Sequence, residues 1–136
     1  SVEQISCRPD FMVLMYPVIS FADGITHLGS REALLGKNPV GDLQNLYSNE
    51  LQVKDDTPPA FFVHANNDDA VPVENTLLMY KALRGKNIPA ELHILSEGKH
   101  GFGLSVNNPH IASWTGNLKL WLNWLLNSYQ KTAEKN

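Results

Sequence analysis

Two residues of this sequence, Asp68 and His100, have the types and the spacing of an acid–base pair. Asp68 lies in the turn-forming run 66–69, directly after the apolar segment 60–65, and His100 lies in the glycine-rich run 98–103, which two residues separate from the apolar segment 90–95. A carboxylate that accepts a hydrogen bond from imidazole Nδ1–H fixes the tautomer and stabilises the imidazolium, so that Nε2 is free to act as a base. The pair therefore indicates chemistry in which a histidine activates a nucleophile.

Three apolar segments, at residues 11–16, 60–65 and 90–95, are predicted strands that must position this pair. The first does not alternate, which predicts burial on both faces, whereas the third alternates, which is typical of a strand nearer the sheet edge. Helical patterns separate the strands, so the strands are expected to pair in parallel with right-handed crossovers. The prediction is an α/β fold of about three parallel strands with flanking helices, with both loops at one edge of the sheet.

The predicted helices have recognisable ends and inner faces. Ser30 is the expected N-cap of a helix at 31–35 that Gly36 ends, a second helix is expected at 43–51, and a third runs from Pro72 to about residue 86. The third is expected to turn Val73, Leu77, Tyr80 and Leu83 inward. Asn108 and Pro109 begin the last helix, whose inner stripe is Ile111, Trp114, Leu118, Trp121, Leu125 and Tyr129.

Composition bounds the classes of function. The 136 residues suit one domain, and 43% hydrophobic with 18% charged residues can bury a core. A net charge of −3 without a basic run argues against nucleic acid and anionic membranes as partners, and the apolar runs are shorter than the ~20 residues of a membrane span. The single cysteine, Cys7, excludes an internal disulfide and is expected to be a buried apolar filler.

Three stretches resemble known enzymes. Residues 64–73 (HANNDDAVPV) are similar to the H-G-x-x-D-x-x-V-P acid loop of α/β-hydrolases, with Ala65 in place of the glycine, and residues 98–102 (GKHGF) are similar to their G-x-H-G-F histidine loop. Residues 27–36 further resemble bacterial acetylxylan and feruloyl esterase-like enzymes, which are often labelled xylanases. The resemblance covers about residues 8–128 and implies that Asp68 and His100 are the acid and the base of a catalytic triad.

The nucleophile of that triad is not recognisable in the sequence. The family order is Ser, Asp, His, yet no serine here stands in a G-x-S-x-G motif. The resemblance therefore implies the C-terminal half of the α/β-hydrolase fold, with residues 1–136 as a single partial domain that lacks the nucleophile-bearing N-terminal half. The first residues show neither an initiator Met nor a signal peptide, so we expect the chain to start within a larger protein and leave its localisation unknown.

The implied activity is hydrolysis of carboxylic esters through a Ser–His–Asp acyl-enzyme, without metal or organic cofactor. The expected substrate is a small-molecule or oligosaccharide ester, namely an acetyl or feruloyl ester of plant polysaccharide. The chain alone is expected to be inactive without its missing half and to self-associate through the open edge of the first strand. The alternatives are a prolyl-oligopeptidase-like or dienelactone-type hydrolase, or a non-catalytic α/β assembly module.

Other residues compete for these roles. Asp69 is the alternative triad acid, or else supports the dipole of the following helix. His64 is expected to be a packed structural histidine bonded to backbone, and His27, His93 and His110 to be surface or capping residues. A zinc site built from His64, His93 and His100 lacks the spacing of metal ligands.

The remaining candidates concern the nucleophile and the substrate pocket. Ser20 follows the first strand and could face the edge of the sheet that carries Asp68 and His100. It is a weak candidate for a substitute nucleophile, because no elbow motif surrounds it. Phe102 and Leu104 either line a pocket or pack within their loop. Trp114 and Trp121 are expected in the core and Trp124 partly exposed, rather than forming a sugar platform.

Overall fold

The computed structural model describes residues 6–133 and contains a parallel three-stranded sheet in the order β1-β2-β3. The strands are β1 (Met12–Met15), β2 (Ala60–Ala65) and β3 (Ala90–Leu95). The central strand β2 is buried along its whole length, as suits a continuous apolar run between two neighbours. The predicted α/β fold, the bounds of β2 and β3 and the edge position of β3 are confirmed.

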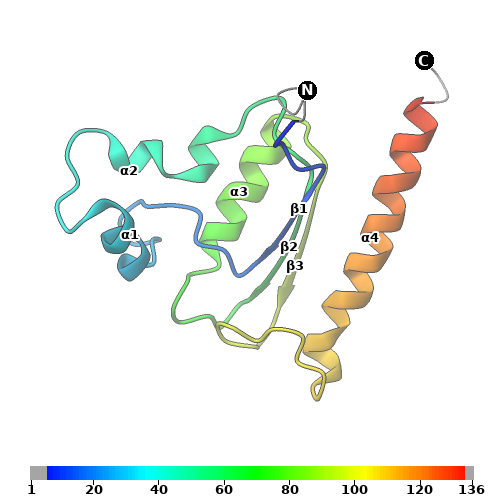
Figure 1. Ribbon diagram of the computed structural model, residues 1–136. Helices are drawn as coiled ribbons and strands as arrows, with labels where there is room; N and C mark the ends of the chain where they lie inside the picture. Colours follow the sequence, from blue (N-terminus) through cyan, green and yellow to red (C-terminus); the bar gives the residue numbers. More distant parts are fainter. Residues whose placement is uncertain (1–5, 134–136) are drawn as a thin grey trace.

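Two helices cover the two faces of the sheet (Figure 1). Successive strand residues point to opposite faces, and the core divides accordingly. On one face, Phe61 and Val63 pack with residues of α4 (Pro109–Ala133), and on the other, Phe62 packs with residues of α3 (Glu74–Gly85). No helix of the described residues is both long enough and apolar enough to span a membrane.

The inner stripes of these helices follow the predictions with two exceptions. In α4, Ile111, Trp114, Trp121 and Leu125 are buried and Leu118 is partly buried, but Tyr129 is 44% exposed. In α3, Leu83 is buried but Leu77 is 41% exposed. The helix begins at Glu74 rather than Pro72 and turns Asn75, Thr76 and Met79 inward instead, because the first two have polar partners beneath the helix.

The first strand is less enclosed than its apolar sequence indicates. β1 pairs only with β2 within residues 6–133, and Val13 is 36% exposed. The prediction of burial on both faces is therefore wrong for this chain, because α4 lies over β2 and β3, and Val13, which pairs with Phe61 on that face, is only partly covered. Cys7 is also exposed rather than buried, since it precedes the strand and lies outside the core.

The segment between β1 and β2 contains α1 (Leu28–Leu35), α2 (Leu43–Leu46) and the 3₁₀ helix η2 (Asn49–Gln52). His27, not Ser30, is the N-cap of α1, because its ring accepts the Ser30 N–H; Gly36 ends the helix at φ 78° as predicted. The single helix expected at 43–51 is interrupted at Ser48, whose hydroxyl donates back to the Gln44 carbonyl and accepts from the Phe21 N–H.

Candidate active site

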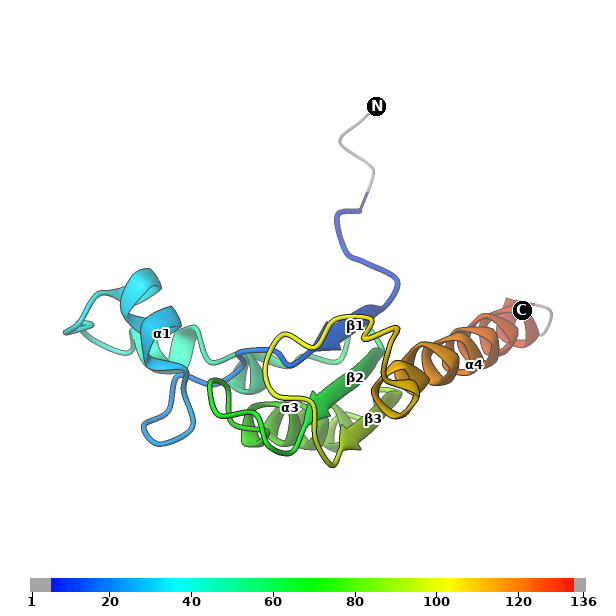
Figure 2. The same ribbon diagram turned by 90° about the horizontal axis from the view of Figure 1, so that it is seen from below.

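The sheet register brings the two predicted loops together. Ala65 and Leu95 are the last paired residues of β2 and β3, and the Asn66 N–H donates to the Leu95 carbonyl at 2.7 Å. Both strands run in the same direction, so their loops leave the sheet at one edge, where Figure 2 shows them side by side. Across this edge, His100 Nδ1 lies 2.8 Å from Asp68 Oδ2.

The Asp68 carboxylate is enclosed and fully bonded. Its side chain has no exposed surface, and Oδ1 accepts from the N–H groups of Ala70 (3.0 Å) and Val71 (2.8 Å). Burial alone would raise the pKa of this carboxyl, but hydrogen bonds from Val71, His100 and Ala70 outweigh burial and hold the pKa below its ordinary value. The carboxylate is therefore a fixed negative charge aimed at His100.

His100 presents its other nitrogen outward. Its side chain is 38% exposed, and among the described residues Nε2 has no hydrogen-bond partner. Because Nδ1 donates to the carboxylate, Nε2 is unprotonated in the neutral ring and is able to accept a proton from a group that approaches it. This arrangement suits a general base.

The histidine loop is held by Asn67 and by one glycine. Asn67 Oδ1 accepts from the N–H groups of Gly98 (2.9 Å) and Lys99 (3.1 Å), which ties the acid loop to the histidine loop. Gly98 has φ 157°, and a Cβ there would lie 3.2 Å from the Ala65 Cβ and from the Phe102 ring. Only glycine fits this close approach without displacing a neighbour. Asn67 was not among the residues predicted from the sequence, although its place beside Asp68 is a usable signal.

Tyr16, which directly follows β1, packs against the ring of His100. The two rings meet edge-on with centroids 4.8 Å apart, and Phe102 packs against the same tyrosine at 4.9 Å. Tyr16 has φ 38°, a left-handed conformation that is unusual for a bulky residue and is often found at functional sites. Its N–H donates to the Val63 carbonyl at 2.8 Å, so Tyr16 keeps a backbone hydrogen bond to β2 in this left-handed conformation.

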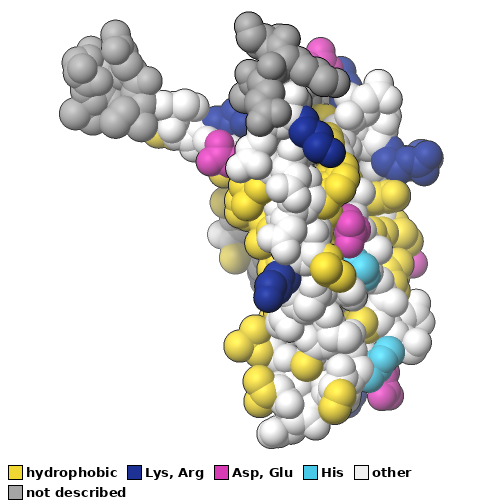
Figure 3. Space-filling view, turned by 90° about the vertical axis from the view of Figure 1, so that its right-hand side faces the viewer, with side chains coloured by type: hydrophobic (Ala, Val, Ile, Leu, Met, Phe, Trp, Pro, Cys, Tyr) yellow, Lys and Arg dark blue, Asp and Glu magenta, His cyan; other side chains and the backbone are white. Residues whose placement is uncertain are grey.

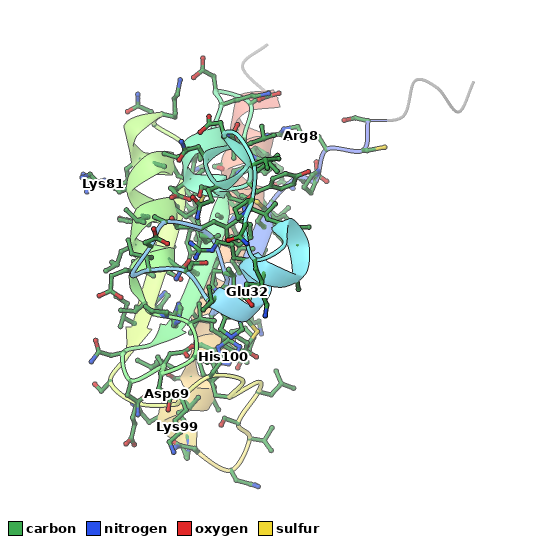
Figure 4. All side chains as sticks on the ribbon, turned by 90° about the vertical axis from the view of Figure 1, so that its left-hand side faces the viewer. Arg8, Glu32, Asp69, Lys81, Lys99 and His100 are labelled. Atoms are coloured by element: carbon green, nitrogen blue, oxygen red, sulfur yellow. The ribbon has the colours of Figure 1, made fainter. Side chains whose placement is uncertain are left out.

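The other candidate residues, Asp69 and Ser20, do not join the Asp68–His100 pair in the structure. Asp69 is exposed and makes no hydrogen bond or ion pair within residues 6–133; Figure 4 shows it with Lys99 and His100 at one end of the molecule, away from Arg8. Ser20 is fully buried and its hydroxyl accepts from the Ala22 N–H, so it is not available to a substrate. Among the described residues, no three His, Cys, Asp or Glu side chains converge on a metal site.

Most of the remaining aromatic and histidine residues lie where they were expected, but His93 is half-buried against Phe61 rather than a surface or capping residue. Trp114 and Trp121 are buried and Trp124 is 54% exposed, and Phe102 packs on the core while Leu104 is 60% exposed. His27 caps α1, half-buried His93 bonds to Glu91, and His110 is exposed. His64 is buried and bonded to backbone as expected, but it also contacts Asp68.

Comparison with known proteins assigns the chain to a family. Residues 25–128, most of the chain, match the prolyl oligopeptidase family. The chain belongs to that family. The match spans α1, the acid loop, the histidine loop and nearly all of α4, so this family member carries both Asp68 and His100 inside the matched region.

Two curated relatives share two fifths of their aligned residues with this family member. Endo-1,4-beta-xylanase B of Butyrivibrio fibrisolvens is 42% identical over 112 residues, and an acetylxylan esterase of Xylanibacter ruminicola is 40% identical over 100 residues. These alignments cover 82% and 71% of this chain but only 17% and 21% of the relatives. The predicted resemblance to acetylxylan esterases and to proteins labelled xylanases is confirmed.

Solved structures confirm the α/β-hydrolase fold. An acetyl ester-xyloside bifunctional hydrolase from Caldicellulosiruptor lactoaceticus superposes with a TM-score of 0.86 at 44% identity, over 91% of this chain and 45% of that one. The carboxylesterase Cest-2923 from Lactobacillus plantarum superposes with a TM-score of 0.71 at 21% identity, which is a likeness of fold. The chain thus spans less than half the length of these structures.

Proposed function

We propose that this chain supplies the acid and the base of a serine ester hydrolase, with Asp68 as the acid and His100 as the base. The observation that carries the proposal is the 2.8 Å contact from His100 Nδ1 to a carboxylate without exposed surface, while Nε2 faces outward. The nucleophile is a serine on another part of the same polypeptide, since no serine of this chain stands in a G-x-S-x-G motif. Residues 1–136 are then one part of a larger hydrolase domain.

In the proposed reaction, His100 Nε2 removes the proton of that serine as its oxygen attacks the ester carbonyl. The C–O bond to the alcohol then breaks, and the imidazolium returns the proton to the leaving alkoxide. Water attacks the resulting acyl-enzyme, with His100 again as base, and releases the acid and the free serine. Asp68 keeps its negative charge throughout and stabilises the imidazolium.

The proposed substrate is an acetyl or feruloyl ester on a plant polysaccharide. The names of two relatives support the acetyl ester, because one is an acetylxylan esterase and another is an acetyl ester-xyloside hydrolase. The family also takes its name from peptidases, so cleavage of a peptide bond is the competing outcome. Both reactions use the same pair of residues, and the test must therefore separate them by substrate.

The test compares substrates on the polypeptide that carries this chain together with its serine. We expect hydrolysis of p-nitrophenyl acetate and release of acetate from acetylated xylan, without cleavage of a proline-containing chromogenic peptide. His100→Ala should lower kcat by at least about 10³-fold, whereas His110→Ala, the same change at an exposed histidine, should leave it unchanged. The 136-residue chain alone should be inactive; turnover by it at the rate of the complete enzyme contradicts the proposal.

A further inference from the structure

A second histidine, His64, contacts the same carboxylate oxygen as His100. His64 Nε2 lies 3.1 Å from Asp68 Oδ2 and 2.9 Å from the Val71 carbonyl, and its Nδ1 lies 2.7 Å from the Thr76 hydroxyl. The side chain has no exposed surface. Asp68 Oδ2 thus lies between two imidazoles, one buried beneath α3 and one at the surface.

The partners of His64 define its tautomer. Nε2 faces two acceptors, a carboxylate and a carbonyl, so Nε2 carries a proton and donates it. Nδ1 then accepts from the hydroxyl of Thr76 in the neutral ring. Both nitrogens are engaged and the ring is enclosed, so His64 has neither a free lone pair nor a path to a substrate.

We propose that His64 is a positioning residue that holds the Asp68 carboxylate in the orientation that His100 requires; this rests on the function proposed above. Two backbone N–H groups hold Oδ1, but among the described side chains only His64 and His100 donate to Oδ2. Without His64, Asp68 Oδ2 is held by the half-exposed ring of His100 alone. The carboxyl group is then able to rotate about Cβ–Cγ and to bind water instead of His100.

The surroundings suit this role because three elements fix the ring. His64 is the fifth residue of β2, Val71 belongs to the acid loop, and Thr76 lies in the first turn of α3. A buried polar network in which every member is bonded is rigid. The orientation of the carboxylate is consequently tied to the sheet and to the helix, not only to its own loop.

The experiment measures the Asp68–His100 hydrogen bond directly, by the downfield NMR resonance of the His100 Nδ1 proton in the polypeptide that carries this chain with its serine, prepared with labelled histidine. His64→Leu removes all three hydrogen-bonded contacts of the ring, and His64→Gln keeps an N–H donor near the position of Nε2. His93→Leu is the matched control, because it makes the same change on the neighbouring strand at a ring that bonds to Glu91 instead. We expect the resonance to move upfield or exchange with water in His64→Leu, and to persist in His64→Gln and His93→Leu.

An unchanged His100 resonance in folded His64→Leu overturns the proposal, whatever the chain hydrolyses. If His64→Leu does not fold, Thr76→Val decides, because it removes only the donor to Nδ1: a smaller shift in the same direction supports the role, and no shift overturns it. In the complete enzyme, His64→Leu should lower kcat about 10- to 100-fold, as loss of an outer orienting partner does at metal sites, with little change in KM and with rescue by His64→Gln. Because the NMR readout needs no catalysis, it separates this proposal from the ester hydrolase proposal.

Discussion

Two regions depend on side chains that bond to backbone: the rim, meaning the sheet edge where the acid loop and the histidine loop meet around Asp68, and the segment between β1 and β2. They differ in how completely they are held. At the rim, Asp68 accepts from two backbone groups and two imidazoles, all from β2, its loop and the next loop. The segment is fixed mainly at its start, where Asn75 Oδ1 accepts from Ile19 and Ser20 while its amide donates to Ile25 and Pro72. A later residue, buried Ser48, also ties it back to Phe21.

Beyond this fixed start, the segment exposes apolar side chains. Val40, Leu46 and Leu51 are 78%, 57% and 59% exposed, and no residue of α1, α2 or η2 is buried. Apolar side chains also flank α4 on the face that Figure 3 shows. The contrast teaches that the Asp68 carboxylate is complete in its polar contacts, whereas the apolar residues of the segment between β1 and β2 are only partly covered.

The largest predicted stability effect tests the fixed start of the segment. Asn75→Ala leaves the N–H groups of Ile19 and Ser20 and the carbonyl of Ile25 without their partner in a buried place, which costs about 2–3 kcal/mol in the free energy of unfolding. Urea titration measures this loss, and limited proteolysis should show faster cleavage between β1 and α1. The NMR resonance of the His100 Nδ1 proton should not change, because the rim has its own partners.

The matched control for Asn75→Ala is Asn45→Ala, the same change at an exposed position of α2. We expect its free energy of unfolding to stay within about 0.5 kcal/mol of the parent. Equal losses in the two variants would show that the buried amide has no special role, and loss of the His100 resonance in Asn75→Ala would show that the two regions are not independent.

A smaller effect follows from the lowered pKa of Asp68. An unfolded aspartate titrates near pH 4, and the folded value lies lower, so the unfolded state binds the proton first as pH falls. The stabilisation by Asp68 is therefore complete well above pH 4 and is lost as pH falls through the folded value. In urea titrations between about pH 2.5 and pH 7, Asp68→Asn should have a shallower acid dependence than the parent, and Asp69→Asn should have the parent's slope. Parallel curves for all three proteins would be the contrary result.

The parts of the molecule that could be predicted from the sequence are those set by local pattern. The apolar runs at 60–65 and 90–95 coincide with β2 and β3, and Asn108 accepts from the N–H groups of His110 and Ile111 at the start of α4. The meeting of Asp68 and His100 followed from parallel pairing, because loops after neighbouring strands share an edge.

The rest depends on tertiary contacts that no pattern shows. His64 reaches Asp68 across the tight turn after β2, and Thr76 faces inward, where its hydroxyl contacts His64. Ser48 ends the predicted helix at 43–51 through a partner 27 residues away, Phe21. The exposure of Val13 likewise depends on which elements pack over that face of β1.

The central claim is that Asp68, and not its neighbour Asp69, is the acid of the triad. The most direct test is kcat for p-nitrophenyl acetate of Asp68→Asn and Asp69→Asn in the polypeptide that carries this chain with its serine. The same change is made at adjacent residues, one enclosed against His100 and one exposed. We predict that kcat falls about 10⁴-fold in Asp68→Asn and stays within about twofold of the parent in Asp69→Asn, the size expected for a surface change without partners. Equal rates in the two variants, or a larger loss in Asp69→Asn, would contradict the account.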